Sequence, residues 1–419
     1  MTLSCSECGA VAKKGDVFCA ACNGLLEFSA PEAGKPARAL KALFAERQSA
    51  TTLRGRSGVW RFRELLPPIA EDAIVTLGEN QVPVYAAPRG ARYAGLARAA
   101  YLHLGMNPTA SFKDAGMTVA VSQAHAAGAR LAACASTGNT AASMAAYCAR
   151  AEMRALVLVP ATGISESKVV QTLDYGADVV ALDGDFDAAL AMVRKLDPAR
   201  VAIVNSVNPY RIEGQKCAAF VLLEQREWRA PDWLVLPGGN LGNSSAFGKG
   251  FREAVALGLA DRVPRIAVVQ AAGAAPFYKA FTTGQELVPV SAQTSATAIK
   301  IGAPASWKKA LREVRSSRGT VTAVSDEEIA DARAIVGRDG VGCEPASAAS
   351  LAGVRKLVAE GTILPGDDVV IVLTGHVLKD TAYAAEYHRS GAQFANRIGA
   401  AHSEAELLAR IETLVTARV

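Results

Sequence analysis

Residues Asn107-Pro108-Thr109-Ala110-Ser111-Phe112-Lys113-Asp114 precede a run of small and apolar residues from Ala115 to Val121. This composition predicts a helix packed closely on a neighbour, with Ser111 as its N-cap and Lys113 in its first turn. The field of a helix N-terminus and partial burial both disfavour a charged ammonium, so Lys113 is predicted to be a nucleophilic amine. The alternative is an ordinary solvated lysine at a helix start, and the rest of the chain decides between the two.

The bulk composition limits the class of protein. The chain has 419 residues, enough for two or three domains, and half of them are hydrophobic. Its formal net charge is +5 without a long basic run, so no nucleic-acid partner is expected. No apolar run approaches the roughly 20 residues that span a membrane. The N-terminus lacks the basic start and apolar core of a secretory signal, so we expect a cytoplasmic protein without a membrane partner.

Four of the eight cysteines form two C-x-x-C pairs near the N-terminus, Cys5 with Cys8 and Cys19 with Cys22. Four thiolates complete the tetrahedral coordination of one zinc ion and leave no position for a substrate. A structural zinc ribbon is therefore predicted, with metal-free cysteines as the alternative. A redox pair is less favoured because no thioredoxin-like pattern surrounds it. The other four are expected to be reduced packing residues: Cys134, Cys148, Cys217 and Cys343.

From about residue 75 onward, short apolar runs alternate with alanine-rich helical patterns. This alternation predicts an α/β fold with parallel sheets covered by helices on both faces. The predicted strands are 131–135, 155–159, 178–182, 201–204, 233–236, 266–269 and 369–373. Near the C-terminus, Leu407, Leu408, Ile411 and Leu414 recur at helical spacing and predict a packed terminal helix.

Polar or glycine-rich loops follow three of these strands, where ligands bind in open parallel sheets. Ser136-Thr137-Gly138-Asn139-Thr140 suits a carboxylate, although a capping turn is the alternative. Gly238-Gly239-Asn240-Leu241-Gly242-Asn243 suits one phosphate, with a ligand-free glycine turn as the alternative. Thr374-Gly375-His376 places a hydroxyl where it can meet a ring nitrogen.

A further segment, Asn205-Ser206-Val207-Asn208-Pro209-Tyr210-Arg211, sets an arginine beside amide and hydroxyl groups. An arginine fork suits two phosphate oxygens, although Arg211 could instead pair with Glu213 or lie on the surface. A reactive lysine, a single-phosphate cradle and a neutral partner for a ring nitrogen are together the requirements of pyridoxal 5′-phosphate. Their joint presence predicts that cofactor.

With these segments the sequence resembles the threonine synthase family, within the fold-type II group of pyridoxal-phosphate enzymes. The resemblance covers most of residues 75–380 and includes Ala296 to Trp307 and Cys343 to Ser350. It implies two open, mostly parallel twisted sheets flanked by helices, as in the tryptophan synthase β subunit, plus the small N-terminal zinc ribbon. The implied domains are a ribbon over 1–28, a large cofactor-binding domain over 29–95 and 206–419, and a small α/β domain over 96–205.

The resemblance also implies a role for each candidate residue. Lys113 would bond the cofactor covalently and later move protons, Asn139 would hold the ring hydroxyl oxygen, and Thr374 would meet the pyridine nitrogen. The cofactor phosphate would be held by Gly239, Asn240, Leu241, Gly242 and Asn243. The carboxylate and phosphate ends of the substrate would be held by Ser136, Thr137, Thr140, Asn205, Ser206 and Arg211.

An enzyme of this kind converts O-phospho-L-homoserine and water to L-threonine and phosphate, and we expect it to be a homodimer. The chain departs from the family pattern at Ala110, at Ala115 and at Val82, where Gly, Arg and Thr are usual. The leading alternative is therefore a paralogue such as a cysteate synthase, which takes O-phospho-L-serine and sulfite. A dehydratase is opposed by the phosphate-site residues, and a non-catalytic regulator is opposed by the intact Lys113.

Overall fold

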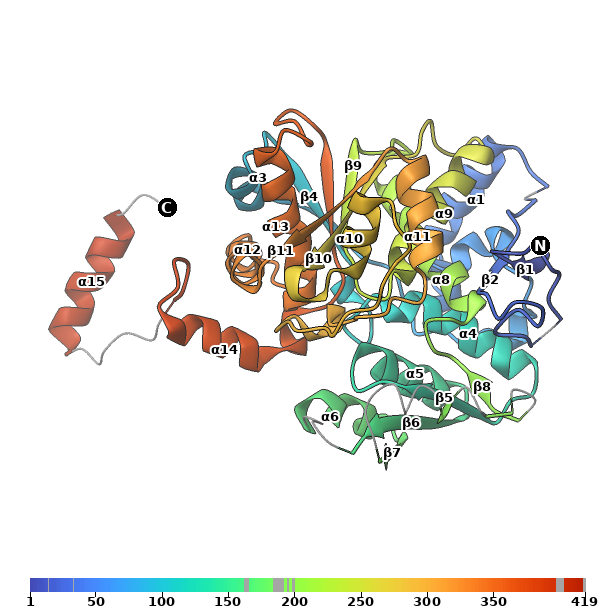
Figure 1. The fold of residues 1–419 in the computed structure, drawn as a ribbon. Coiled ribbons are helices and arrows are strands. Elements are labelled where there is room, and N and C mark those ends of the chain that lie inside the picture. The colour runs from blue at the N-terminus through green and yellow to red at the C-terminus, as the bar shows by residue number, and fades with distance from the viewer. Residues whose placement is uncertain are drawn as a thin grey trace.

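The computed structural model of the chain describes residues 1–13, 15–32, 34–161, 166–183, 192–193, 196–197, 200–396 and 403–416. Two sheets organise it (Figure 1): a six-stranded sheet, and a four-stranded sheet that lies beneath it in that view. The predicted α/β class with parallel sheets flanked by helices is confirmed.

The six-stranded sheet has the strand order β11-β10-β9-β12-β4-β3. All neighbours are parallel except the edge pair β3 and β4, which is antiparallel. The strands are β3 (Val84–Ala86), β4 (Ala99–His103), β9 (Trp233–Pro237), β10 (Arg265–Ala271), β11 (Thr320–Val324) and β12 (Val369–Leu373).

Helices cover both faces of this sheet, and successive strand residues pack into opposite cores. In β9, Leu234 and Leu236 join one hydrophobic core, whereas Trp233 and Val235 join the other. The first core contains residues of α1 (Ala37–Gln48), α8 (Pro209–Gln225), α9 (Gly242–Ala256) and α11 (Trp307–Ser316). The second contains residues of α3 (Pro88–Ala94), α12 (Asp326–Arg338) and α13 (Pro345–Ala359).

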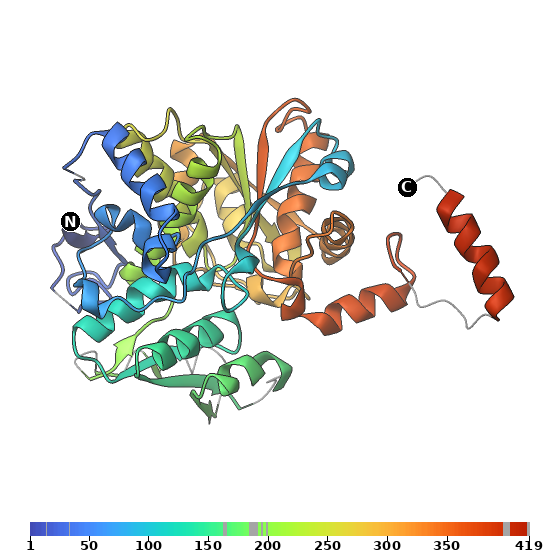
Figure 2. The same ribbon diagram turned by 180° about the vertical axis from the view of Figure 1, so that it is seen from behind.

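The four-stranded sheet is parallel throughout, in the order β7-β6-β5-β8. Its strands are β5 (Leu131–Ala135), β6 (Arg154–Pro160), β7 (Asp178–Leu182) and β8 (Ala202–Ile203). It is accompanied by α4 (Lys113–Ala126), α5 (Asn139–Arg150) and α6 (Glu166–Asp174) (Figure 2). Helix α4 crosses α8 so closely that a Cβ on Gly214 would lie 1.9 Å from the carbonyl oxygen of Ala115. The predicted close packing of the lysine helix is confirmed.

All seven predicted strands are present; three have the predicted bounds, and the bounds of the other four differ by one or two residues. Two longer strands were not predicted, β4 and the edge strand β11, because alanine and threonine interrupt their apolar pattern. The domain limits remain a proposal. Strand β4 falls inside the range 96–205 proposed for the small domain, yet it pairs with β12 of the six-stranded sheet.

The N-terminal ribbon consists of the antiparallel strands β1 (Leu3–Cys5) and β2 (Leu26–Phe28). It docks on α11, where Lys308 pairs with Glu7 at 2.5 Å and Arg312 pairs with Glu27 at 2.9 Å. The ribbon is thus attached to helices that cover the six-stranded sheet, α11 and also α9, whose Lys249 donates to Phe28 O.

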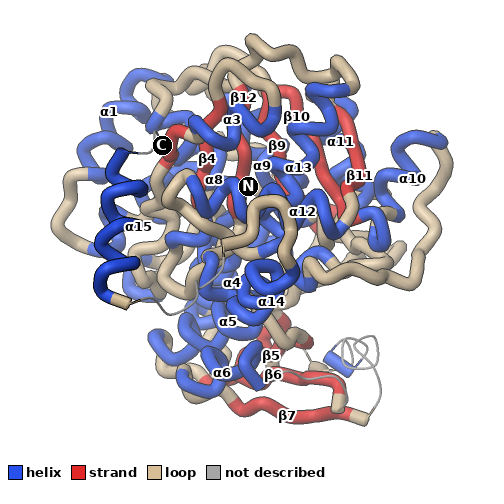
Figure 3. The backbone as a smooth tube through the Cα atoms, turned by 90° about the vertical axis from the view of Figure 1, so that its left-hand side faces the viewer, coloured by secondary structure: helices blue, strands red, loops and turns tan. Residues whose placement is uncertain are grey.

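The remaining α-helices of the described residues are α2 (Leu53–Arg56), α10 (Pro276–Thr283), α14 (Thr381–Ser390) and α15 (Glu404–Thr416). Helix α15 is present as predicted, but its predicted packing is wrong. It stands away from the rest of the chain in Figures 1 and 2 and lies in front of the body in the view of Figure 3. Its Leu408 and Leu414 are 57% and 63% exposed. Among the described residues, no helix combines the length and apolar character needed to cross a bilayer.

Candidate active site

The lysine loop is hydrogen-bonded to the end of β12. The N–H of Phe112 donates to Thr374 O at 2.9 Å, and the N–H of His376 donates to Ala110 O at 3.0 Å. Helix α4 begins at Lys113, which places this residue in the first turn as predicted. The predicted N-cap is wrong, because Phe112 occupies that position and Ser111 Oγ accepts only a long hydrogen bond of 3.4 Å from Lys113 N. The neighbouring chain segment, rather than a serine cap, fixes the start of the helix.

Asp114 stabilises the same loop through hydrogen bonds to its carboxylate. Its carboxylate accepts hydrogen bonds from Thr109 N at 2.7 Å, Thr109 Oγ1 at 2.5 Å and Ser143 Oγ at 2.6 Å. Burial raises the pKa of Asp114 to about 6. The bond from Ser143 connects the residue next to Lys113 to helix α5 of the four-stranded sheet. The lysine loop is therefore fixed on one side by β12 and on the other by α5.

Lys113 opens into a cavity of about 1040 Å³ between the two sheets. The cavity collects segments that are far apart in the sequence, as expected at the carboxyl ends of parallel strands. The predicted residues that line it are Lys113, Ser136, Thr137, Asn139, Thr140, Asn205, Ser206, Gly239, Asn240, Leu241, Gly242, Asn243 and Thr374. All predicted site residues except Arg211 and the cysteines therefore meet in one cavity.

The environment of Lys113 favours a neutral amine. Burial and the nearby charge of Arg211 lower the pKa of Lys113 to about 7, and Glu344 opposes this shift. The Lys113 Nζ also lies 4.1 Å from the centroid of the Phe112 ring, a contact that favours the charged form and so opposes the effect of burial. A neutral amine is the form that attacks an aldehyde.

We expect the cofactor-free protein to combine with pyridoxal 5′-phosphate faster as the pH rises from about 6 to about 8. The neutral fraction of Lys113 grows as the pH passes its pKa of about 7. Stopped-flow absorbance at a series of pH values measures the rate. A midpoint near 10.5, the ordinary lysine value, would contradict this prediction.

The glycine loop after β9 has the properties of a phosphate cradle. Helix α9 begins at Gly242 and directs its free N–H groups to the cavity. A Cβ on Gly239 would lie 3.2 Å from Ala298 O, so the loop is packed tightly against its neighbour. Both amide atoms of Asn243 and the hydroxyl of Ser244 are buried without a partner among the described residues. These unpaired polar atoms, together with the neutral lysine, fit pyridoxal 5′-phosphate.

Arg211 lies beneath the cavity rather than on its wall. Its side chain is 0% exposed and donates from Nη1 to Val204 O at 3.2 Å. Its Nε and Nη2 have no hydrogen-bond partner in the described part of the chain, and burial lowers its pKa to about 10. A buried guanidinium with two unused donors can serve an anion that enters from the cavity.

Five charged residues of the cavity were not predicted as site residues, and Glu344 and Lys379 are the two whose hydrogen bonds join separate parts of the site. The other three are Asp174, Lys300 and Asp380. Glu344 accepts hydrogen bonds from Asn139 and Thr374, and its pKa is raised by burial. Lys379 donates to Gln171 of α6. The sequence did contain a signal for Glu344, because it lies in the segment Cys343 to Ser350 that carries the resemblance to the family. The resemblance assigns no role to a single residue of that segment.

The four N-terminal cysteines form one cluster. Their Sγ atoms all lie within 4.8 Å of one another, with 3.4 Å between Cys5 and Cys22 and 3.6 Å between Cys8 and Cys19. Zinc–sulfur bonds of about 2.3 Å in a tetrahedron place sulfur atoms about 3.8 Å apart. The cluster therefore fits a zinc ion, in agreement with the predicted ribbon.

We expect Cys5→Ser combined with Cys8→Ser to remove zinc and to leave the cofactor bound. The cluster belongs to the ribbon, and no cysteine of the cluster lines the Lys113 cavity. Atomic emission measures the zinc content of the variant, and absorbance measures its cofactor content. Loss of the cofactor along with the zinc would show that the ribbon is part of the catalytic core.

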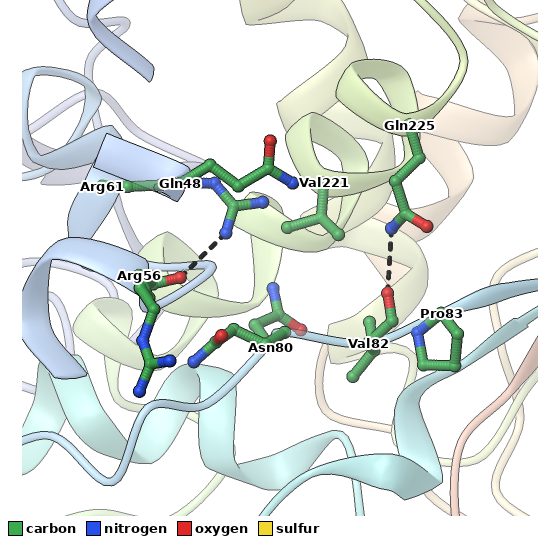
Figure 4. Close-up of a pocket in the computed structure, with 9 residues that line it drawn as sticks. Gln48, Arg56, Arg61, Asn80, Val82, Pro83, Val221 and Gln225 are labelled. Atoms are coloured by element: carbon green, nitrogen blue, oxygen red, sulfur yellow. Dashed lines mark hydrogen bonds between the residues drawn. The ribbon is translucent and has the colours of Figure 1, made fainter. Parts of the chain in front are cut away.

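A second cavity of about 310 Å³ lies among α1, η1 (Trp60–Leu65) and α8 (Figure 4). Arg61 donates to Arg56 O at 3.0 Å on one side, and Gln225 donates to Val82 O at 2.8 Å on the other. It holds none of the predicted site residues. It does place Val82, one of the departures from the family pattern, outside the Lys113 cavity.

The comparisons with known proteins agree with this geometry. The family of pyridoxal-phosphate dependent enzymes matches residues 75–375. The chain belongs to this family. Its members' cofactor is the one that the lysine, the cradle and Thr374 predict, so the chain is an enzyme that depends on pyridoxal phosphate.

Individual relatives show which members of the family this chain is similar to. The chain is 43% identical to threonine synthase of Methanosarcina acetivorans over 90% of this chain and 92% of that one. It is 47% identical to threonine synthase of Synechocystis over 80% of this chain and 86% of the relative. The predicted resemblance to the threonine synthase family is confirmed.

Solved structures support the fold. Threonine synthase from Escherichia coli aligns with a TM-score of 0.70 at 20% identity, covering 97% of this chain and 94% of that one. Threonine deaminase from Solanum lycopersicum aligns with a TM-score of 0.61 at 19% identity, covering 73% and 83%. At these identities the matches concern the fold alone, and the fold-type II architecture is confirmed.

Proposed function

We propose that this chain is a threonine synthase, which converts O-phospho-L-homoserine and water to L-threonine and phosphate. The observation that carries the proposal is the single cavity in which the neutral Lys113, the glycine cradle and the segment Asn205–Ser206 meet. The identity to curated threonine synthases over most of both chains supports it. The residue roles below belong to the same proposal.

Lys113 would hold the cofactor, with Gly239 to Asn243 around its phosphate and with Asn139 and Thr374 at its ring. When bound, pyridoxal 5′-phosphate spreads the negative charge that develops next to the substrate Cα. Lys113 would accept and return protons at Cα and Cβ. Its pKa of about 7 suits this exchange near neutral pH.

The substrate would lie between two polar segments. Ser136, Thr137 and Thr140 surround the N-terminus of α5 and would bind the carboxylate. On the other side, Asn240 donates to Ser206 Oγ, and Arg211, which donates to Val204 O, has two unused donors. Asn205, Ser206 and Arg211 would orient the phosphate and stabilise its charge as it leaves from Cγ.

We expect Arg211→Ala to weaken binding of phosphorylated substrates at least tenfold more than it weakens binding of the cofactor. A hydrogen bond to a charged group contributes about 1.5–3 kcal/mol, which corresponds to a factor of ten or more. Substrate KM and the cofactor dissociation constant are measured on the same variant. Equal losses of both would place Arg211 outside the substrate site.

Two of the three departures from the family pattern, Val82 and Ala115, give no support to a paralogue, whereas Ala110 lines the Lys113 cavity. Val82 lines the smaller cavity, and Ala115 is 2% exposed and packs against Gly214 of α8. Neither residue lines the Lys113 cavity, and unlike Arg211 neither has a polar side-chain atom that could bind the substrate. Ala110 has a positive φ of 64°, which explains why glycine is usual there.

Phosphate release by the cofactor-loaded protein tests the proposal. O-phospho-L-homoserine is offered alone, and O-phospho-L-serine is offered with and without sulfite. We expect phosphate and L-threonine from the first substrate and no sulfite-dependent release from the second. The opposite result would be no phosphate release from O-phospho-L-homoserine and sulfite-dependent phosphate release from O-phospho-L-serine. It would contradict the proposal and indicate a cysteate synthase.

We also infer a homodimer in the cytoplasm. All eight cysteines, each in the described part of the chain, are free thiols, and four of them are buried outside the ribbon. Such thiols are typical of a reducing compartment such as the cytoplasm.

The proposed homodimer is tested by light scattering of the holoenzyme, which measures its mass. Twice the chain mass of 43.6 kDa is expected.

A further inference from the structure

The smaller cavity of about 310 Å³ is lined mainly by charged and amide side chains and shares no residue with the Lys113 cavity. Figure 4 shows Arg56 and Arg61 on one side of it and Gln225 and Pro83 on the other. Its volume lies at the lower end of the range for ligand pockets, which is roughly 300–1,000 Å³. Since one water molecule occupies about 30 Å³, the cavity has room for about ten, so only a small molecule fits.

Two arginines give one side of this cavity a positive charge. Arg61 is 2% exposed, and its guanidinium donates to Arg56 O at 3.0 Å and to Glu224 Oε2 at 2.6 Å. Its Nε has no hydrogen-bond partner in the described part of the chain. Glu224 neutralises Arg61, whereas Arg56 is exposed and its guanidinium pairs with no described carboxylate. The cavity therefore has one uncompensated positive charge, which suits a carboxylate.

The amide of Asn80 offers a hydrogen-bond acceptor at the same cavity. Asn80 is 1% exposed, and its Nδ2 donates to Gly58 O at 3.3 Å. A carbonyl oxygen can only accept, so this bond fixes the orientation of the amide and leaves Oδ1 as the free atom. That Oδ1 has no partner among the described residues. A ligand with N–H groups would satisfy this buried acceptor, and the apolar side chains of Val82 and Val221 beside it would contact a small side chain.

Asn80 also connects the cavity to the lysine loop. Its N–H donates to Asn107 Oδ1 at 2.7 Å, and Asn107 O accepts from Ala110 N at 2.8 Å. Ala110 lines the Lys113 cavity. A ligand bound to Asn80 would therefore oppose local opening of the loop that ends at Lys113.

We propose that this cavity is a second ligand site, for a small free α-amino acid, connected to the lysine loop through Asn107. Arg56 and the unused N–H groups of Arg61 would bind the carboxylate, and Asn80 Oδ1 would accept a hydrogen bond from the ammonium group. A molecule with only one of these two charges would leave one side of the cavity without a partner. The proposal does not rest on the proposed substrate, because no residue of the Lys113 cavity belongs to this site.

Calorimetry on the borohydride-reduced holoenzyme tests the proposal, because reduction fixes the cofactor on the protein and prevents its transfer to an added amino acid. The probes are glycine, L-alanine, L-serine and L-threonine, and we expect at least one of them to bind, with one molecule per chain. Propionate lacks the ammonium group and ethylamine lacks the carboxylate. Each should bind at least tenfold more weakly, because it loses the hydrogen bonds of one charged group.

Arg56→Ala should weaken this binding at least tenfold, and Arg54→Ala is its matched control. Both arginines belong to the short helix α2. Arg54 does not line the cavity and pairs with Glu71 at 3.0 Å, so its loss should leave binding unchanged. Hydrogen exchange followed by mass spectrometry should show slower exchange over residues 107–113 when the amino acid is bound.

Failure of all four amino acids to bind, or equal binding of propionate, would overturn the proposal. Equal affinities of Arg56→Ala and Arg54→Ala would overturn it as well, because the amino acid would then bind elsewhere. Unchanged exchange over residues 107–113 would overturn the connection to the lysine loop. Because no turnover is measured, a protein that acted on another substrate would leave the result standing.

Discussion

Lys113→Ala should lower the rate of phosphate release roughly 10³-fold or more, because general acid–base catalysis by a positioned group contributes about 10²–10⁴-fold. Lys113 is the first residue of helix α4 and lines the cavity between the two sheets. Its pKa is lowered to about 7. A methyl group cannot bond the cofactor or carry a proton. Steady-state assays with O-phospho-L-homoserine measure the loss.

Lys279→Ala is the control for this change. Lys279 is an exposed lysine of helix α10 and does not line the cavity, so its loss should leave the rate unchanged. Borohydride reduction followed by peptide mapping should place the cofactor on Lys113 in the unmodified protein. Full turnover by Lys113→Ala would refute the proposed mechanism.

The fold was predictable where burial on both faces leaves a continuous apolar run. All five residues of β9 are buried, and such strands were recognised from composition alone. The edge strand β11 alternates Thr320, Val321 and Thr322, so its apolar run is broken. Helix α15 was predicted from its periodicity, but periodicity does not identify the surface on which a helix packs.

The site was predictable where a loop follows a strand, because the topology of a parallel sheet gathers such loops at one edge. Glu344 and Lys379 were missed because their partners Asn139 and Gln171 are 205 and 208 residues away in the sequence. Arg211 was predicted as a phosphate ligand from its neighbours, but the depth at which it lies depends on the crossing of α4 and α8. Local patterns thus indicate the chemistry of single segments, and the fold decides which of them contact each other.

The second large effect is expected from Glu213→Ala, which should lower the free energy of unfolding by about 3–5 kcal/mol. Glu213 is 1% exposed and pairs at 2.5 Å with both Lys216 and Lys249. Lys249 also donates to Phe28 O at 2.6 Å, so the cluster holds the ribbon strand β2 against α8 and α9. Alanine would leave two buried ammonium groups facing the single carboxylate of Glu253.

Urea denaturation of the holoenzyme followed by circular dichroism measures this loss. Glu227→Ala is the matched control, because the ion pair of Glu227 with Arg229 is 3.0 Å long but lies on the surface, with side chains 82% and 76% exposed. Exposed pairs contribute little to stability, since water solvates the charges whether or not the pair forms. Equal midpoints for the two variants would mean that the buried charges of α8 and α9 are compensated without Glu213. A lower midpoint for Glu213→Ala, together with faster proteolysis of the ribbon, would instead identify this cluster as the element that joins the ribbon to the helix carrying Arg211.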